Sequence, residues 1–296
     1  MRSVRQPAFA KINLCLHVLG KRPDGYHELR TVFQTIRLHD TLELALGSGP
    51  GIELETSDAE LPTGRDNLVW RAIDVLRHEL RIREGVRARL VKRIPAARGL
   101  GGGSSDAAAA LLATLRVTGK KLPAGRLLKL AASLGADVPF FLLGGRALGV
   151  GRGDEIYPLP DLPRRTVVVV SPRDIAVGTR EAYGWLGGHL TKRGAASRLW
   201  SFCALCWSPQ EAGVSNDFEA VVFRRHPRLL KIKRGLLERG AAEAALAGSG
   251  SAVFGVFRSP AQARRAAQGF PQDQVFVCNT LSRVEYRRAQ RWRGGV

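Results

Sequence analysis

The sequence has few of the features that mark membrane, secreted or disulfide-rich proteins. Among its 296 residues there are four cysteines, and aromatic residues make up 7%. It contains no run of about 18 apolar residues, so hydropathy predicts no membrane-spanning helix. The residues after Met1 carry charge and lack the apolar core of a signal peptide. We therefore expect a cytoplasmic protein that does not bind membranes.

The cysteines are too few and too scattered for a structural zinc site. Cys203 and Cys206 form one Cys-x-x-Cys pair. Such a site needs a second pair of ligands, and no second pair of cysteines or histidines lies nearby. A redox role is the alternative, but we interpret these cysteines as buried or incidental thiols.

Acidic residues are scarce relative to basic ones. The chain has 46 lysines and arginines against 26 aspartates and glutamates, which gives a net charge of +20. A basic surface attracts anions such as nucleotides, nucleic acids or acidic membranes. Nucleic-acid sites interleave basic and aromatic residues, whereas these arginines are scattered except in Arg287–Arg293. We expect no nucleic-acid partner, and a basic RNA-binding module is the alternative.

One glycine-rich segment is the strongest signal in the chain. Gly99–Gly103 contains four glycines, and Ser104, Ser105 and a run of alanines and leucines follow it. Glycine permits positive φ angles and close backbone approach, and a helix N-terminus attracts anions. We predict a phosphate-binding loop that leads into a helix with Ser104 or Ser105 as N-cap. A flexible linker is the alternative, but linkers rarely lead directly into such a helix.

Two common phosphate loops do not fit this segment. The GxxxxGK[ST] loop requires a lysine where the chain has Ser104. The GxGxxG dinucleotide loop, started at Gly99, also ends on Ser104. The segment is therefore a phosphate loop of another kind.

Hydrophobic patterns predict a mixture of strands and helices. Residues 8–19 alternate as a strand that places Lys11 and Asn13 on one face. Further strands are expected at 29–38, 40–46, 52–56, 86–92, 155–159, 166–171, 252–257 and 274–279. Helices are expected at 68–80, 104–117, 125–134, 179–186, 216–223, 229–246 and 260–267, with Asp66-Asn67 as the cap of the first. A proline-rich segment near 158–163 suggests two domains, 1–160 and 161–296, the second an open sheet with helices on one side.

Three other features accompany the glycine loop. Lys11 and Asn13 share a strand face near Tyr26 and His27, Asp137 is a lone carboxylate in an apolar segment, and residues 247–251 form a second loop of small residues. Each has a plainer explanation. Lys11 fits a solvated edge charge, Asp137 a turn or cap, and the second loop an ordinary turn. A helix capping box is the ordinary explanation for Asn216 with Glu219.

As a set these segments resemble the GHMP family of small-molecule kinases. The matching segments occur in family order along nearly the whole chain, at Ala10–Leu14, Asp24–His27, Pro95, Gly99–Asp106, Gly135–Pro139, Ser215–Asp217 and Ala247–Ser251. Asp-Gly-Tyr-His with Ala-Lys-Ile-Asn-Leu is typical of the members that phosphorylate methylerythritol linked to cytidine diphosphate. A member acting on mevalonate, homoserine or a sugar is the alternative. Arg98 departs from the pattern, because a glycine is common there.

The resemblance implies an α+β protein with two domains and the active site between them. The N-terminal domain would be like domain 2 of ribosomal protein S5, and the C-terminal domain would be ferredoxin-like. The cofactors would be ATP and Mg²⁺, and the partner would be the small-molecule alcohol. We expect a monomer or a weak homodimer.

The residues also suggest roles within such a site. Asp137 would accept the proton of the attacking hydroxyl, and Lys11 would neutralise charge on the transferred phosphoryl group. The residues expected to bind ATP are Pro95, Gly99, Leu100, Gly101, Gly102, Gly103, Ser104 and Ser105. The acceptor side would include Asn13, Gly248 and Ser249, with Tyr26, His27 and Tyr183 as stacking face, polar edge and opposing ring for cytosine.

Overall fold

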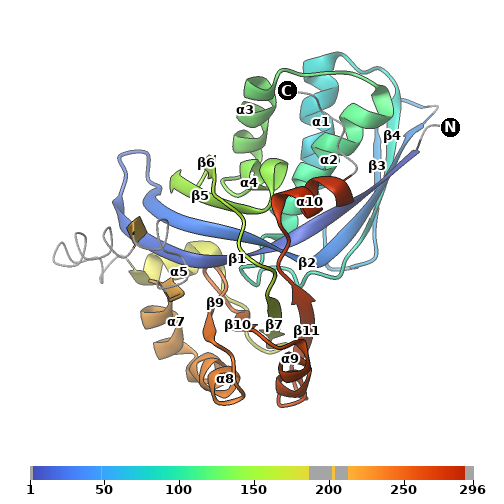
Figure 1. Cartoon of the computed structure of the whole chain (residues 1–296). Helices are drawn as coiled ribbons and strands as arrows, with labels where there is room; N and C mark the ends of the chain where they lie inside the picture. Colours follow the sequence, from blue (N-terminus) through green and yellow to red (C-terminus); the bar gives the residue numbers. More distant parts are fainter. Residues whose placement is uncertain (1–2, 48, 187–201, 204–212, 291–296) are drawn as a thin grey trace.

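The computed structural model describes residues 3–47, 49–186, 202–203 and 213–290. Two sheets face each other in the middle of the molecule, and helices cover the outer face of each sheet (Figure 1). None of the described helices is long and apolar enough to cross a membrane. The architecture is α+β.

The first sheet is built on a long antiparallel hairpin. Its strand order is β3-β4-β2-β1-β8, and β5 and β6 extend it from β2. Its strands are β1 (Ser3–Lys21), β2 (His27–Gly47), β3 (Ile52–Thr56), β4 (Gly85–Val91), β5 (Arg146–Gly151), β6 (Glu155–Pro158) and β8 (Ser215–Asn216). Its helices are α1 (Leu68–Leu80), α2 (Gly102–Thr118), α3 (Ala124–Leu134), α4 (Val138–Leu143) and α10 (Arg283–Ala289).

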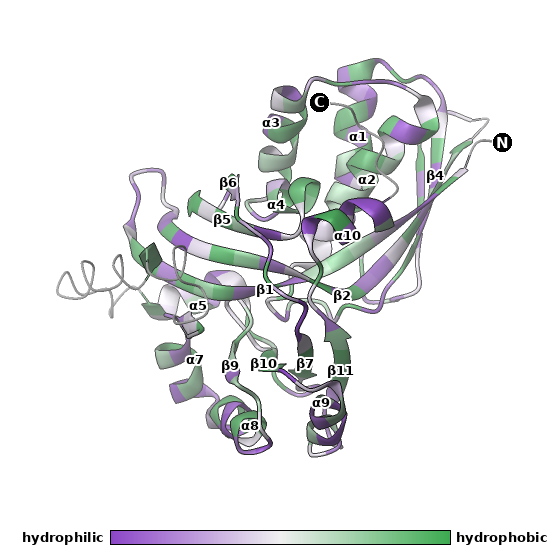
Figure 2. Ribbon diagram, viewed as in Figure 1, coloured by the Kyte–Doolittle hydropathy of each residue, from purple (hydrophilic) through white to green (hydrophobic). Residues whose placement is uncertain are grey.

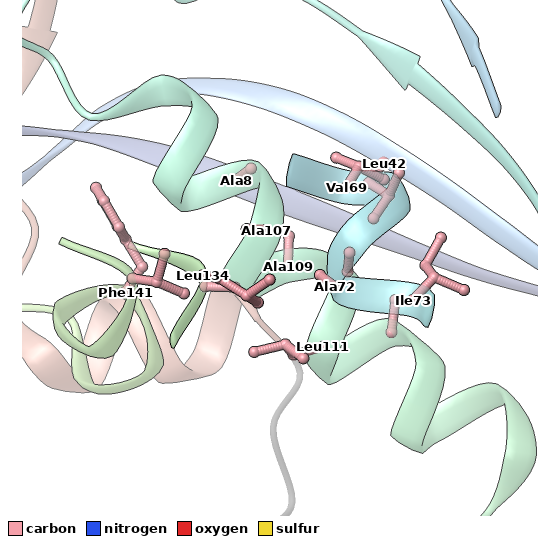
Figure 3. Close-up of a cluster of buried hydrophobic side chains, with 14 of the residues drawn as sticks. Ala8, Leu42, Val69, Ala72, Ile73, Ala107, Ala109, Leu111, Leu134 and Phe141 are labelled. Atoms are coloured by element: carbon pink, nitrogen blue, oxygen red, sulfur yellow. The ribbon is translucent and has the colours of Figure 1, made fainter. Parts of the chain in front are cut away.

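Small side chains hold the helices close to the first sheet. The middle of α2 is a run of buried alanines, so its backbone comes close to β1 and to α1 (Figure 3). Leucines and valines of β2, β4 and α1 fill the space around it. This packing fixes the position of the N-terminus of α2, where the glycine loop ends.

The second sheet is antiparallel and has the strand order β11-β7-β10-β9. Its elements are β7 (Thr166–Ser171), α5 (Thr179–Leu186), α7 (Glu219–Arg225), α8 (Pro227–Glu238), β9 (Glu243–Leu246), β10 (Val253–Phe257), α9 (Pro260–Ala267) and β11 (Gln274–Asn279). Val168 and Val170 face the helices, whereas Val167 and Val169 face the first sheet. Both faces of β7 are therefore buried, and its four central residues are valines (Figure 2).

The predicted strands at 29–38 and 40–46 are one strand, β2. Asp40, where the second of these strands was expected to begin, is fully buried. Its carboxylate accepts hydrogen bonds from Lys92 Nζ and from the backbone N–H groups of Arg93 and Ile94. A charged residue in mid-strand is thus compensated by partners distant in sequence, which the local pattern did not reveal.

Three helix predictions also need correction. The helix predicted at 229–246 ends at Glu238, because Gly240 turns the chain with a φ of +91° into β9. Asn216 lies in β8 and does not form a capping box. The N-cap of α2 is Gly101, not Ser104 or Ser105.

The C-terminal part of the described chain returns to the first sheet. The helix α10 was not predicted, and it lies in the arginine-rich region. Its Tyr286 is buried, and the Tyr286 hydroxyl donates a hydrogen bond to the carbonyl of Phe141. The division into 1–160 and 161–296 stays a prediction. Residues 187–201, Cys206 and residues 291–293 lie outside the described residues.

Candidate active site

Lys11 lies at the centre of a buried polar chain on the hairpin of β1 and β2. Its side chain is on the same strand face as that of Asn13, as predicted, and Lys11 Nζ donates to Asn13 Oδ1 at 2.8 Å. Asn13 Nδ2 donates to Thr31 Oγ1 at 2.7 Å, and Thr31 Oγ1 donates to the carbonyl of Cys15 at 2.7 Å. Because Lys11 is only 4% exposed, this chain holds its ammonium group in one position.

Asp137 supplies the negative charge next to that ammonium group. One of its oxygens, Oδ2, lies 3.5 Å from Lys11 Nζ, and its side chain is 32% exposed. Asp137 directly precedes α4, but its carboxylate does not cap that helix. Burying a lysine without a counter-charge is costly, so this pair explains the buried Lys11 and leaves one side of the carboxylate accessible.

The glycine loop passes over Lys11 with too little space for larger residues. Gly99 and Gly101 have φ angles of +77° and +72°. A Cβ atom at Gly99 would lie 1.8 Å from the carbonyl oxygen of Ala247, and one at Gly101 would lie 2.8 Å from the ring of Phe141. These glycines are required by the close approach of neighbouring elements, as well as by the backbone angles.

The N-terminus of α2 presents free backbone N–H groups at this loop. The first hydrogen bond into the helix joins the Ser105 N–H to the carbonyl of Gly101. The N–H groups of Gly102, Gly103 and Ser104 come before that bond, so they belong to the helix N-terminus that attracts anions. This supports the phosphate-loop prediction, although a glycine and not a serine begins the helix.

The second small-residue loop packs against the glycine loop. Asn216 Nδ2 donates to the carbonyls of Leu246 and Gly248 at 2.8 and 2.7 Å. A Cβ atom at Gly248 would lie 2.9 Å from the carbonyl oxygen of Gly99 and 3.2 Å from Lys11 Nζ. Glycine at 248 therefore lets residues from both sheets meet around Lys11.

Two adjoining cavities enclose these residues. The first has a volume of about 290 Å³ and is lined by Lys11, Asn13, Pro95, Gly99–Ser104, Asp137, Tyr183, Gly248 and Ser249, with others. The second has a volume of about 900 Å³, and its lining includes Tyr26, His27, Ser104, Asp137 and Tyr183. Asp137, Ser104 and Tyr183 line both cavities, so the carboxylate stands where the two meet. Ser105 lines neither, because its side chain is buried.

Aromatic rings line the second cavity. His27 and Tyr183 are stacked, with ring centroids 4.7 Å apart and planes at 26°. Tyr26 is 54% exposed, and the guanidinium of Arg152 lies 4.9 Å from its ring centroid. Burial lowers the pKa of His27, and the charge of Lys21 lowers it further, so the ring stays neutral and keeps an acceptor nitrogen.

Two family models match the chain. GHMP kinases N terminal domain covers residues 67–145, and GHMP kinases C terminal covers residues 201–274. The chain is 47% identical to the 4-diphosphocytidyl-2-C-methyl-D-erythritol kinase of Solibacter usitatus, over 95% of this chain and 89% of the relative.

The chain belongs to the GHMP kinase family.

Other comparisons agree with this assignment. The chain is 43% identical to the 4-diphosphocytidyl-2-C-methyl-D-erythritol kinase of Moorella thermoacetica, over 93% of this chain and 98% of the relative. The crystal structure of a 4-(cytidine 5'-diphospho)-2C-methyl-D-erythritol kinase superimposes with a TM-score of 0.79 at 34% identity, over 94% of this chain and 99% of that one. Homoserine kinase from Cytophaga hutchinsonii shares the fold, with a TM-score of 0.76, 19% identity and 95% coverage of both chains.

Sequence reasoning did not assign several residues that surround the site of this GHMP kinase. Thr31 completes the Lys11–Asn13 chain, and Thr179 and Phe218 line the first cavity. Arg98 lines it too, and its guanidinium donates to Ser251 Oγ at 2.9 Å. The sequence marked Arg98 only as a departure from the family pattern, directly before the glycine segment. Thr31, Thr179 and Phe218 are recognisable only once the strands and helices are placed in space.

A buried ionic cluster fixes the strand that leads into the glycine loop. Lys92 Nζ lies 2.5 Å from a carboxylate oxygen of Asp40 and 2.8 Å from one of Asp106. Burial raises the pKa of the Asp106 carboxyl, and the Lys92 ammonium opposes that shift. Because Asp106 lies early in α2 and Lys92 directly follows β4, the cluster joins the two ends of the loop between them.

A second ionic contact joins β1 to the segment after β8. Asp217 accepts a hydrogen bond from the backbone N–H of Val18 at 2.9 Å, and its other oxygen lies 3.2 Å from His17 Nδ1. Burial acts to lower the pKa of His17, but the hydrogen bond to Asp217 and the nearby Cys15 outweigh it, and the pKa rises to about 9. Protonated His17 therefore stabilises the folded protein.

This pair predicts a pH-dependent contribution to stability. Since the folded pKa of about 9 exceeds the ordinary histidine pKa of 6.5, the contribution is complete below pH 6.5 and is lost as the pH rises through 9. We expect Asp217→Asn to reduce the free energy of unfolding, with the deficit shrinking by about 2 kcal/mol between pH 6.5 and pH 10. Urea unfolding of both proteins at several pH values measures this, and a deficit that does not change with pH would contradict it.

Proposed function

We propose that this GHMP kinase transfers the γ-phosphoryl group of ATP to the 2-hydroxyl of 4-diphosphocytidyl-2-C-methyl-D-erythritol, in non-mevalonate isoprenoid precursor synthesis. The observation that carries the proposal is the place of Asp137 between two cavities. One side holds a phosphate loop, and the other holds aromatic rings suited to a nucleobase. The names of the closely similar relatives support the same choice.

The glycine loop is the proposed site for the phosphates of ATP. The N–H groups at the start of α2 would bind phosphate oxygens, and Gly99 and Gly101 let the backbone come close to them. Pro95, Leu100, Gly102, Gly103 and Ser104 line the same cavity and complete the proposed contacts. We exclude Ser105 from direct contact, because its hydroxyl is buried away from the cavity.

Proton transfer and charge stabilisation are the proposed work of Asp137 and Lys11. The acceptor hydroxyl oxygen forms the new bond to phosphorus, its proton passes to a carboxylate oxygen of Asp137, and the bond from the γ-phosphorus to ADP breaks. Lys11 orients the carboxylate from 3.5 Å and offers its charge to the phosphoryl oxygens. Asn13 and Gly248 keep Lys11 in place, the first by a hydrogen bond and the second by its small size.

Mg²⁺ is the proposed metal cofactor, and it would supply positive charge beside the phosphates of ATP. Within the described residues no group of three or more His, Cys, Asp or Glu side chains could hold a metal ion. Mg²⁺ keeps several waters and relies on substrate phosphates, so it needs only one or two protein ligands. The Ser104 hydroxyl lines the cavity and would be a protein ligand, which leaves the Asp137 carboxylate to accept the proton.

The aromatic rings of the second cavity are proposed to bind cytosine. Tyr183 and His27 form a preassembled stack, and Tyr26 offers an exposed ring beside them. Tyr183 therefore packs directly on His27. The sequence had instead suggested Tyr183 as a separate ring on the opposite side of the cytosine. Ser249 lines the first cavity, and its hydroxyl lies 3.2 Å from Thr179 Oγ1, so we place it at the acceptor end of the reaction centre.

We also propose the finer fold assignment and the cellular setting. In the C-terminal part, β7, β9, β10 and β11 with their helices follow the β-α-β-β-α-β order, which supports a ferredoxin-like domain. The N-terminal part is proposed to be like domain 2 of ribosomal protein S5. We propose a cytoplasmic monomer or weak homodimer.

A substrate panel tests the proposed activity. We expect ADP release with 4-diphosphocytidyl-2-C-methyl-D-erythritol and about 10³-fold lower kcat/KM with mevalonate, homoserine or galactose, because those acceptors leave the aromatic site unfilled. Methylerythritol 4-diphosphate, which lacks only the cytidine moiety, is the matched control for base recognition. Equal efficiency with this control would refute cytosine recognition, and faster turnover of mevalonate or homoserine would refute the assignment.

A further inference from the structure

The second cavity has charged residues that the proposed reaction does not use. Its lining includes Lys21, Arg152 and Arg180 as cations and Asp24 and Asp137 as anions. We propose that Lys21 and Arg180 bind the diphosphate of the acceptor from two sides. The inference rests on the proposed function, and it concerns the negative charge between the base and the alcohol.

The other charges of the cavity are already matched. Asp137 is paired with Lys11, and Asp24 Oδ2 accepts a hydrogen bond from Arg22 Nε at 3.3 Å. Arg152 Nε donates to Asp154 Oδ2 at 3.0 Å. Within residues 3–47, 49–186 and 213–290, Lys21 and Arg180 form no ion pair with a carboxylate. The two remaining positive charges match an entering diphosphate.

Lys21 and Arg180 also flank the aromatic stack. Lys21 is the residue opposite His27 in the β1–β2 hairpin, and its charge is close enough to lower the pKa of that imidazole. Arg180 and Tyr183 are three residues apart in α5, so they lie on one face of the helix. Since Tyr183 stacks on His27, cations from two different elements lie beside the same pair of rings.

This position fits the chemical order of the acceptor. Its base would lie at the rings and its alcohol at Asp137, so the diphosphate must lie between them. An arginine can bind two phosphate oxygens at once, and a lysine contributes a compact charge. Both side chains are exposed, so salt should weaken their effect strongly.

Binding measurements test the inference without turnover. Calorimetric titrations compare 4-diphosphocytidyl-2-C-methyl-D-erythritol with cytidine, with the ATP site filled by a non-hydrolysable ATP analogue. We expect the diphosphate compound to bind at least about tenfold more tightly at about 50 mM NaCl, with most of this margin lost at about 300 mM. In Lys21→Gln/Arg180→Gln the margin should fall below about threefold, and the affinity for cytidine should stay near that of the parent.

The matched control carries the same changes on a distant surface. Lys231 and Arg234 are exposed residues of α8, and Lys231→Gln/Arg234→Gln removes equal charge. The control should keep the full margin. Three results would each overturn the inference. The difference in affinity could be unchanged in Lys21→Gln/Arg180→Gln, it could fall equally in the control, or it could be absent in the parent. Failure of the proposed function appears separately, as absence of phosphorylation when the parent binds the compound.

Discussion

Asp137→Asn should lower kcat by about 10²–10⁴-fold and change the affinity for ATP by less than about threefold. Asparagine has nearly the same shape as aspartate, but it cannot accept the hydroxyl proton at neutral pH. The carboxylate lies between the two cavities and does not cap α4, so the loss of its charge should leave the helix intact.

A matched aspartate separates catalysis from a general effect of charge. Asp74 lies on α1, and its side chain is 35% exposed, close to the 32% of Asp137. Steady-state kinetics on Asp74→Asn should give a kcat within about twofold of the parent, since surface substitutions have small effects. If Asp137→Asn also retained kcat within a few-fold, Asp137 would not be the base.

Local sequence signals predicted the elements with sharp boundaries. The helix at 68–80 follows the Asp66-Asn67 pair, and the Asn67 side chain accepts a hydrogen bond from the Val69 N–H as expected for an N-cap. The strands at 52–56, 166–171 and 274–279 and the helices at 179–186 and 260–267 have the predicted limits. In these segments the polar or proline boundaries coincide with the ends of the hydrophobic pattern.

The predictions for other segments were wrong because the structure of those segments depends on residues distant in sequence. Asp40 continues a strand only because Lys92 and two backbone N–H groups compensate its charge. Asn216 resembled a helix cap, but its amide binds Leu246 and Gly248 from the second loop. A single sequence shows the polar residue in each case, and it does not show which partner satisfies it.

The residues of the candidate site also divide into those that could be predicted from local sequence and those that could not. The glycine loop, Lys11 and Asp137 could be predicted, because close backbone approach and isolated charge leave clear marks in a sequence. The stacking of Tyr183 on His27 joins residues from the two halves of the chain, so no local pattern contains it. Lys21 and Arg180 carried no signal at all, since exposed cations are common in a chain of net charge +20.

Lys11→Met should lower kcat by about 10²–10³-fold, which corresponds to about 3–4 kcal/mol of transition-state stabilisation. Methionine fills much of the space of the lysine stem but lacks the ammonium group. Asn13 Oδ1 then loses its donor, and Asp137 loses its counter-charge. Thermal unfolding and steady-state kinetics on the same preparation distinguish this loss of activity from unfolding. Lys231→Met on α8 is the control, and its kcat should be unchanged.

The combination Lys11→Met/Asp137→Asn shows whether the pair acts as a unit. Each group needs the other: the ammonium orients the carboxylate, and the carboxylate compensates a cation that is only 4% exposed. Effects of residues that act together are far from additive. We therefore expect the double variant to be less than about tenfold slower than the slower single variant. Multiplication of the two single effects would mean that Lys11 and Asp137 contribute independently, and Lys11 would then act on the phosphoryl group alone.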